Sequence, residues 1–391
     1  MIKVLFNGQV ITPHGIIRNG GAVIQGKKIV KIFEGNHFER TGQLIDCLGN
    51  YISPGFIDIH LHGGGGADTM DGTVEALETI ASTHARFGTT SIVPTTLSSP
   101  KENILKALDA IHEARIRKVR GANILGAHLE GNYFSMNQKG AQNPKYIIPP
   151  VKEEYDEIIN RTGEVIIISS APEIEGGLEF AKDMSSRGII MSVAHSDATY
   201  EEFEKALEAG FSHVTHIYNG NSWLSSPYYY CQIGVCESAL LMDEVAVEVI
   251  ADGKHLPPKL LELIYKIKGA EQMNLCTDAI RAAAMPEGEY ELGGMKVIVE
   301  DGVAALADRS SFAGSVCTGD RAIRTMYKLA NVPLIDAIKM MTSTPAKLIN
   351  IYKTKGSISV GKDADINVFD EDINILYTLI EGDVFINKLN I

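Results

Sequence analysis

Cysteine is scarce in this chain and does not follow a metal-binding or disulfide pattern. The 391 residues include five cysteines, which are Cys47, Cys231, Cys236, Cys276 and Cys317. Their number is odd, their spacings are wide and no CxxC pair occurs, so the sequence argues against a zinc ribbon and against a disulfide framework. This sparse usage is typical of a reducing compartment, and we therefore expect a cytoplasmic protein.

The sequence also lacks a long apolar run and a block of basic residues. Polar residues or glycine interrupt every apolar stretch well before the ~18 residues that a membrane-spanning helix needs, and the N-terminus lacks the apolar core of a secretion signal. The chain contains 36 Lys and Arg residues and 49 Asp and Glu residues, which gives a net charge of −13 at pH 7. With this acidic balance we expect neither nucleic acid nor a membrane surface as a partner.

Both ends of the chain have a pattern typical of short strands separated by turns. The first 50 residues contain three strand-like segments, at 3–6, 21–24 and 28–33. The last 40 residues contain two more, at 365–369 and 373–377, followed by a hairpin-like turn at Glu381-Gly382-Asp383. Because the two ends of a domain often lie close together, we expect residues 1–52 and 352–391 to form one small β-sandwich domain.

The middle of the chain, residues 53–351, alternates short apolar runs with helix-like segments. Eight of the runs are strand-like, at 56–59, 91–95, 123–129, 164–169, 188–194, 212–217, 245–251 and 273–277. Helix-like segments such as 74–87, which Gly88 closes, separate most of them. Eight strand–helix repeats in about 300 residues predict an α/β protein with a (β/α)8 TIM-like barrel. The alternative, an open doubly wound sheet, would need a GxGxxG fingerprint that the sequence does not contain.

Metal-binding and acidic residue types stand where several of these predicted strands end. A parallel barrel brings the C-terminal ends of its strands to one rim, where barrel enzymes have their active sites. The residues that we expect to gather there are His60, His62, Glu130, His195, His216 and Asp278.

His60 and His62 are the sharpest local signal. Residues two apart in a strand point to the same side, so both imidazoles can bind one ion. Neutral imidazole suits zinc and the later first-row metals. Two histidines would be weak evidence alone, but four further candidate ligands at other strand ends make coincidence a poor explanation. We expect a site for one or two divalent ions, with zinc in first place and iron, manganese, cobalt or nickel as alternatives.

Asp278, at the end of the last predicted strand, is the candidate catalytic residue. A carboxylate beside a metal-activated water can take a proton from it and pass that proton to a leaving amine. The alternative role is a helix N-cap.

Around these positions we expect His128 and His213 to pack inside the barrel, and Asp58 and Asp197 to orient ligand imidazoles.

The same residues carry a family resemblance. The segment PGFIDIHLHG at 54–63 resembles the opening motif of the amidohydrolase superfamily. His128-Leu129-Glu130-Gly131, followed by Lys139-Gly140-Ala141, resembles the N-acetylglucosamine-6-phosphate deacetylase family in particular. Further matching motifs follow in order over nearly the whole chain, at 194–196, 215–219, 252–255, 277–280, 312–315, 344–346 and 356–365.

This resemblance implies metal-dependent hydrolysis of the N-acetyl group of an amino-sugar phosphate, giving glucosamine-6-phosphate and acetate from N-acetylglucosamine-6-phosphate. It implies that Glu130, His195 and His216 hold the principal ion, and that His60 and His62, with Glu130 and Asp278, hold a second. It also implies a homodimer. The substrate-binding residues that it implies are Ala141, Gln142, Asn219, Gly220, His255, Phe312, Ala313, Gly314 and Ser315.

Two departures from the family pattern fall on substrate groups. Gln142 stands where the family usually has a histidine, and no arginine lies between Arg187 and Arg281, where the family has a phosphate-binding one. The segment from Trp223 to Gln232, with its tyrosines at 228–230, offers either a stacking surface for a sugar or a dimer interface. The alternatives are therefore the same chemistry on an unphosphorylated or epimeric N-acetyl sugar, and a non-catalytic binding protein. The candidate phosphate-binding cations are Lys139, Lys254 and Arg281.

Overall fold

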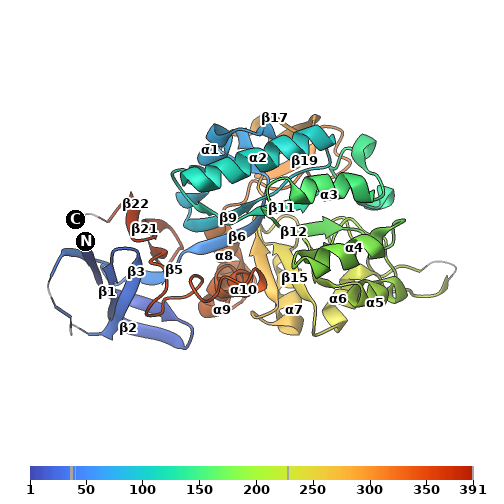
Figure 1. Ribbon diagram of the computed structural model, residues 1–391. Helices are drawn as coiled ribbons and strands as arrows, with labels where there is room; N and C mark the ends of the chain where they lie inside the picture. Colours follow the sequence, from blue (N-terminus) through green and yellow to red (C-terminus); the bar gives the residue numbers. More distant parts are fainter. Residues whose placement is uncertain (36–37, 40, 227–228, 390–391) are drawn as a thin grey trace.

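Both chain ends contribute to one eight-stranded sheet, at the left of Figure 1. The computed structural model describes residues 1–35, 38–39, 41–226 and 229–389. The strand order is β22-β21-β20-β5-β1-β2-β3, with β4 paired to β1. These strands are β1 (Ile2–Thr12), β2 (Gly15–Gln25), β3 (Lys28–Glu34), β4 (Gln43–Asp46), β5 (Tyr51–Pro54), β20 (Ile366–Phe369), β21 (Ile375–Ile380) and β22 (Asp383–Asn387).

The sheet forms because its strands alternate buried apolar and outward side chains, which is the pattern of a half-buried strand. Its own apolar core includes Leu5, Ile24, Ile52, Ile366 and Leu379. The expected C-terminal hairpin is confirmed, since β21 and β22 pair in antiparallel register around the turn at residues 381–382. The two chain ends therefore meet in one sheet, as the sequence predicts.

Among the described residues, nine parallel strands from the middle of the chain form two curved sheets that continue one another. Their orders are β10-β9-β6 and β11-β12-β13-β14-β15-β16. A parallel bridge joins Thr95, after β9, to His128 in β11. The amide of Asp278, after β16, donates a hydrogen bond of 2.9 Å to the carbonyl of His60 in β6. The strands are β6 (Phe56–Leu61), β9 (Thr89–Pro94), β10 (Asn123–Ile124), β11 (Ala127–Glu130), β12 (Val165–Ser170), β13 (Ile190–Val193), β14 (Phe211–Val214), β15 (Ala246–Ile250) and β16 (Met273–Cys276).

Each of the eight predicted apolar runs overlaps at least one of these parallel strands. One detail differs, because the run 123–129 is divided into β10 and β11 rather than forming a single strand. Strands buried on both faces read as continuous apolar runs, which is why they were visible in the sequence.

Helices cover the outside of the curved sheets (Figure 1). They are α1 (Val74–Ala85), α2 (Lys101–Arg117), α3 (Lys152–Asn160), α4 (Gly177–Ser186), α5 (Tyr200–Glu208), α6 (Val235–Leu241), α7 (Pro258–Lys268), α8 (Gly319–Arg324), α9 (Leu334–Met340) and α10 (Ser343–Leu348). Shorter turns of helix are η1 (Thr69–Asp71), η2 (Met136–Gln138), η3 (Pro144–Tyr146) and the π-helical turn η5 (Thr325–Leu329). Within the described residues, no helix has both the length and the apolar character needed to cross a bilayer.

The interior between the strands is filled rather than hollow. Ile57 and Ile59 from β6, Val93 from β9 and Ile167 from β12 pack together with Ala346 of α10. This packed apolar layer supports the strands from inside, so the side chains at their C-terminal ends rest on a rigid base.

A small three-stranded antiparallel sheet follows β16, and the sequence analysis did not predict it. It consists of β17 (Gly288–Leu292), β18 (Met295–Glu300) and β19 (Val303–Leu306), and a separate short pair is formed by β7 (Gly63–Gly64) and β8 (Ala67–Asp68). Gly293 and Gly294 make the β17–β18 turn, both with positive φ, as tight hairpin turns require. The sheet shares a core with Leu97, Ile280 and Ala313, so it packs beside the strand ends that carry the predicted site.

Asn367 joins the terminal sheet to the parallel strands. It is fully buried in β20, donates a hydrogen bond of 2.7 Å to the carbonyl of Gly88 and accepts one of 3.1 Å from the Thr378 hydroxyl. Buried polar groups depend on such partners because no water replaces them.

We predict that Asn367→Ala lowers the free energy of unfolding by about 1–3 kcal/mol, because it leaves the buried Thr378 hydroxyl without its acceptor and opens a small cavity. Asn387→Ala, at an exposed position of β22 in the same sheet, should change it by less than about 0.5 kcal/mol. Denaturant unfolding followed by circular dichroism measures both. Equal effects of the two variants would show that Asn367 does not hold the two parts together.

Candidate active site

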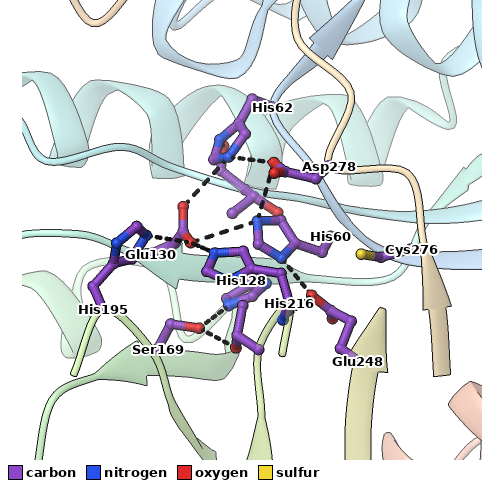
Figure 2. Close-up of polar contacts among 12 residues, drawn as sticks. His60, His62, His128, Glu130, Ser169, His195, His216, Glu248, Cys276 and Asp278 are labelled. Atoms are coloured by element: carbon purple, nitrogen blue, oxygen red, sulfur yellow. Dashed lines mark hydrogen bonds and ion pairs between the residues drawn. The ribbon is translucent and has the colours of Figure 1, made fainter. Parts of the chain in front are cut away.

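The six residues predicted as metal ligands lie together at the C-terminal ends of the parallel strands, and all are buried. Figure 2 shows them around the Glu130 carboxylate. One carboxylate oxygen, Oε1, lies 3.0 Å from His216 Nε2, 3.5 Å from His195 Nε2 and 3.7 Å from His60 Nε2. The other, Oε2, lies 3.3 Å from His62 Nε2. Five strand ends thus converge on Glu130 and on Asp278 beside it.

Asp278 forms the second acidic corner of the cluster. Its Oδ1 lies 3.2 Å from His62 Nε2 and 3.6 Å from His60 Nε2, so these two histidines lie between the carboxylates of Asp278 and Glu130. Ligand atoms of His60, His62 and Asp278 fall within 4.8 Å of one another, and those of His60, Glu130 and His216 do so as well.

The backbone turns sharply at three of these residues. His195, His216 and Asp278 directly follow strand ends and have φ values of 48°, 31° and 47°. Side-chain-bearing residues adopt this left-handed region at a cost of about 1–3 kcal/mol each, and such strain clusters at functional sites. Gly220 supports one of these turns, because a Cβ atom there would lie only 2.6 Å from His195 Nδ1. The geometry aims the three side chains inward.

Three imidazoles are oriented through Nδ1. His62 Nδ1 lies 3.3 Å from the carbonyl oxygen of Thr95, His195 Nδ1 lies 2.7 Å from that of Gln138, and His60 Nδ1 lies 2.7 Å from Glu248 Oε1. Because each of these acceptors takes a hydrogen bond from an Nδ1–H, the Nε2 atoms of the three rings face the carboxylates of Glu130 and Asp278. Histidine ligands of metals usually have such a partner on the second nitrogen.

The donor set fits a divalent metal ion. His60 Nε2 is buried and has no hydrogen-bond partner, although two carboxylate oxygens lie at 3.6 and 3.7 Å. Two ligands at about 2.1 Å from a shared tetrahedral ion lie about 3.4 Å apart, close to these separations. Imidazole nitrogen with carboxylate oxygen suits zinc and several first-row transition metals.

The charges in the cluster are mutually dependent. Burial alone would raise the pKa of Glu130 and of Asp278, but the surrounding imidazoles lower the pKa of both. Burial likewise opposes protonation of His62, yet its hydrogen bonds to Asp278 and Glu130 raise its pKa to about 9. The two carboxylates are therefore ionised and balanced by positive charge on the histidines, which a bound cation would replace.

His128 and His213 differ from the predicted ligands. His128 contacts the Ile59 carbonyl at 3.2 Å and the Ser169 hydroxyl at 2.7 Å, and His213 contacts the Ser192 hydroxyl at 2.9 Å. Burial lowers the pKa of His128 to about 3 and that of His213 to about 4. Both are neutral packing residues within the parallel strands, as expected from the sequence.

The expectation that Asp58 and Asp197 orient the ligand imidazoles is wrong. Asp58 accepts hydrogen bonds from the Thr277 hydroxyl at 2.6 Å and from the His60 amide, and Asp197 accepts them from Ser135 and Gln138. The ring of His60 is held instead by Glu248, which sequence reasoning missed. A signal was present, because Glu248 is the one charged residue in the apolar run 245–251.

A cleft of about 340 Å³ opens onto the cluster. It is lined by seven of the nine residues expected to bind substrate, which are Ala141, Gln142, Asn219, Gly220, His255, Phe312 and Gly314. The other two expected substrate-binding residues, Ala313 and Ser315, are not among the residues that line the cleft. Ala313 packs in the apolar core of the small sheet, and the buried Ser315 hydroxyl donates to the Thr277 carbonyl at 2.5 Å.

The cleft is also lined by residues that the sequence analysis did not predict to bind substrate. They are Leu97, Gly140, Tyr218, Trp223, Ile250, Leu292 and Ser311. Trp223 was expected either to stack on a sugar or to lie in an interface, and its position in the cleft wall favours the first. Leu292 comes from the small sheet that the sequence analysis missed. Tyr228 lies outside the described residues.

Two of the lining side chains already have protein partners. Gln142 Nε2 donates to Glu130 Oε2 at 3.0 Å, while its Oε1 accepts from the Ser98 amide at 2.8 Å. Gln142 therefore holds the central carboxylate rather than pointing freely into the cleft. His255 Nδ1 lies 2.9 Å from Asp252 Oδ2, which leaves its Nε2 for a ligand, and its ring lies against Phe312.

The candidate phosphate-binding cations lie outside this wall. The described lining contains neither Lys nor Arg. Lys139 precedes the lining residue Gly140, and Lys254 precedes His255. Arg281 pairs with Asp71 at 2.9 Å, so its guanidinium already has an acidic partner.

Comparison with known proteins assigns the family. A model of the amidohydrolase family matches residues 51–385. The N-acetylglucosamine-6-phosphate deacetylase of Bacillus subtilis is 34% identical over 385 residues, which cover 97% of this chain and 96% of the relative. The N-acetylgalactosamine-6-phosphate deacetylase of Escherichia coli O157:H7 is 33% identical over 85% of this chain and 86% of its own length.

A solved structure shows the same likeness in three dimensions. The crystal structure of N-acetylglucosamine-6-phosphate deacetylase from Pasteurella multocida superposes with a TM-score of 0.92 at 30% identity, covering 98% of this chain and 99% of that one. Family model, relatives and fold agree over nearly the whole length. The chain belongs to the amidohydrolase family and, within it, to the N-acetylglucosamine-6-phosphate deacetylase family.

Proposed function

We propose that this protein hydrolyses the N-acetyl group of N-acetylglucosamine-6-phosphate to give glucosamine-6-phosphate and acetate. The observation that carries the proposal is the cluster of four histidines and two carboxylates that opens into a sugar-sized cleft. The full-length similarity to deacetylases of amino-sugar phosphates supports the same reaction. A purely structural or binding role would not need six buried titratable groups at one rim.

Glu130, His195 and His216 would hold one divalent ion, and His60 and His62, with Glu130 and Asp278, a second. Zinc is our first choice, with iron, manganese, cobalt or nickel as alternatives. When bound, such an ion polarises the amide carbonyl and lowers the pKa of water so that a nucleophile is available at neutral pH. The two oxygens of Glu130 face different histidines, so both sets of ligands would include this carboxylate.

Asp278 would move the proton. Its carboxylate lines the cleft and is kept ionised by the nearby imidazoles, so it can accept a proton from the attacking water. It then returns that proton to the sugar nitrogen as the carbon–nitrogen bond breaks, which makes the amine a leaving group. His255, oriented by Asp252, and the lining residues Asn219 and Gly220 would hold the sugar in place.

A second candidate is the same chemistry on another N-acetyl sugar. It is favoured by the cleft wall, whose described residues include no Lys or Arg, and by Gln142, which replaces the family's histidine and contacts Glu130. The relative that acts on N-acetylgalactosamine-6-phosphate points to the epimer in particular.

Acetate release over a panel of sugars tests both candidates. The panel contains N-acetylglucosamine and N-acetylgalactosamine, each with and without the 6-phosphate. A highest kcat/KM for N-acetylglucosamine-6-phosphate supports the proposal, and a preference for another member supports the second candidate. Absence of acetate release from every member would contradict both.

We also propose the finer architecture. The contacts between Thr95 and His128 and between Asp278 and His60 join the two curved sheets at both edges, which supports a closed (β/α)8 barrel over residues 53–351. Residues 1–52 and 352–391 would form the β-sandwich domain. The exposed aromatic side chains of Tyr229 and Tyr230 support a homodimer, which light scattering of the purified chain would test.

We predict that Glu130→Ala loses bound metal and activity but remains folded, because the core lies below the rim. Metal content after dialysis should fall below one ion per chain, with deacetylation at background. Glu164→Ala is the matched control, since Glu164 is also a buried carboxylate that contacts a histidine, His112, but lies at the opposite end of β12. Wild-type metal content in Glu130→Ala would overturn its assignment as a ligand.

We predict that Asp278→Asn lowers kcat by about 10²–10⁴-fold, the range typical of general acid–base groups. The amide keeps the size of the side chain but cannot accept the proton, and the ion held by Glu130, His195 and His216 should remain. Asp308→Asn, at an exposed position, should leave kcat unchanged. A fall of less than about tenfold would mean that another group carries the proton.

We predict that Lys139→Ala or Lys254→Ala reduces the preference for the phosphorylated sugar by about 10- to 100-fold, as expected for losing a charge-assisted hydrogen bond of about 1.5–3 kcal/mol. Arg281→Ala should not, because its guanidinium pairs with Asp71. The measurement is the kcat/KM ratio for N-acetylglucosamine with and without its 6-phosphate. A strong preference that neither lysine variant reduces would place the phosphate elsewhere.

A further inference from the structure

Glu248 is a buried carboxylate beneath the candidate metal cluster. It belongs to β15, its side chain is fully buried, and Figure 2 shows it next to His60. Its Oε1 lies 2.7 Å from His60 Nδ1 and accepts a hydrogen bond of 3.3 Å from the His216 amide, while its Oε2 has no hydrogen-bond partner. Among the described residues, no Lys or Arg forms an ion pair with it.

Packing alone does not account for this residue. Its neighbours along the strand are Val247 and Val249, and an isolated buried carboxylate with one unpaired oxygen is unfavourable compared with an apolar side chain of similar volume. The groups that it contacts belong to two candidate ligands. Its position is therefore explained by what it does to His60 and His216.

The contact determines which nitrogen of His60 faces the site. Because Glu248 accepts a hydrogen bond from the Nδ1–H of His60, Nε2 is the nitrogen that points toward Glu130 Oε1 and Asp278 Oδ1 and is free to bind an ion. Without this acceptor the buried Nδ1–H would lack a partner, so the other tautomer or a rotated ring would become favourable. In either case His60 would no longer present Nε2 to an ion.

His60 differs in this respect from two other candidate ligands. His62 and His195 are oriented by backbone carbonyl groups, those of Thr95 and Gln138. Only for His60, among these three rings, does the orienting group belong to a side chain. Substitution of Glu248 can therefore remove the orientation of one ligand while the others keep theirs.

We propose that Glu248 is a positioning residue that prepares His60 to bind, and so allows the chain to hold a second divalent ion. The inference rests on the proposed metal centre and deepens it. The ion held by Glu130, His195 and His216 does not depend on His60, and the 3.3 Å contact of Glu248 with His216 is to the backbone amide rather than to the ring. Loss of Glu248 therefore weakens the second ion selectively.

A direct role of Glu248 as a ligand is the competing explanation. Ligand atoms of His60, Glu248 and Cys276 also lie within 4.8 Å of one another. The Cys276 thiol, however, contacts the Val249 carbonyl at 3.6 Å, and Glu248 already accepts from His60 at hydrogen-bond distance. If these three residues bound an ion themselves, removal of the thiol would release it.

The test measures zinc binding per chain by mass spectrometry of the metal after equilibrium dialysis at defined free zinc, with thermal unfolding as the measure of folding. Glu248→Met removes the acceptor and keeps the volume, and Glu248→Gln keeps a carbonyl acceptor for His60. Cys276→Ala tests the competing site. Glu164→Met is the matched control, because Glu164 also holds a histidine ring, that of His112, far from the cluster.

We expect two bound ions per chain in the wild type, in Cys276→Ala and in Glu164→Met. Glu248→Gln should bind two ions almost as tightly as the wild type. In Glu248→Met the second ion should bind about 10- to 100-fold more weakly, the range for loss of a group that orients a ligand, with the first unchanged. Equally tight binding of both ions in Glu248→Met overturns the inference, as does loss of an ion in Cys276→Ala. If the wild-type chain binds one ion, only the inference about Glu248 is overturned. If it binds none, the proposed metal centre itself is contradicted.

A measurement on the wild type keeps the inference testable even if Glu248→Met does not fold. Nitrogen-15 NMR of the histidine side chains in the zinc-loaded protein reports which ring nitrogen carries the proton. We expect a proton on Nδ1 of His60, which His60→Asn identifies by removing the signal. A proton on Nε2 of His60 in the loaded protein would overturn the assignment of Glu248.

Discussion

The burial of the Glu130 carboxylate among imidazoles is the interaction on which the site depends. A carboxylate with about 1% exposure is unfavourable unless positive charge surrounds it, and four candidate ligand histidines supply its environment. His60 and His62 come from the end of β6, whereas His195 and His216 follow β13 and β14. The parallel strands must therefore have the right order and register before this charge can be buried.

The supporting structure carries the strain that this arrangement requires. Three inward-pointing residues, His195, His216 and Asp278, have left-handed backbone conformations, which are held by hydrogen bonds between neighbouring strand ends such as that from Asp278 to the His60 carbonyl. Below them, apolar side chains pack tightly against α10. The strained, polar rim depends on the rigid core, because only a tightly packed core can hold the rim residues in an unfavourable backbone conformation.

The sequence predicted the parallel strands and the gathering of His, Glu and Asp at their ends because both leave local signals. Doubly buried strands are continuous apolar runs, and His, Glu and Asp at their ends are conspicuous. It did not predict that Glu248, Thr95 and Gln138 orient the rings, since such pairs depend on the register between strands far apart in sequence. The small sheet at 288–306 was missed although its alternating strands and Gly293-Gly294 turn were readable. Its role in the cleft follows only from tertiary packing.

Gln142 shows how chemistry and recognition are connected in this protein. The candidate metal-binding side chains stand at strand ends, whereas the cleft wall is built largely from loops, which can change without disturbing the core of the parallel strands. Gln142 belongs to both, because it lines the cleft and donates to Glu130 Oε2 while its own carbonyl is held by the Ser98 amide. A charged imidazole at this position could reach a substrate, but a glutamine anchored at both ends cannot do so without releasing Glu130. In this chain the residue therefore stabilises the central carboxylate.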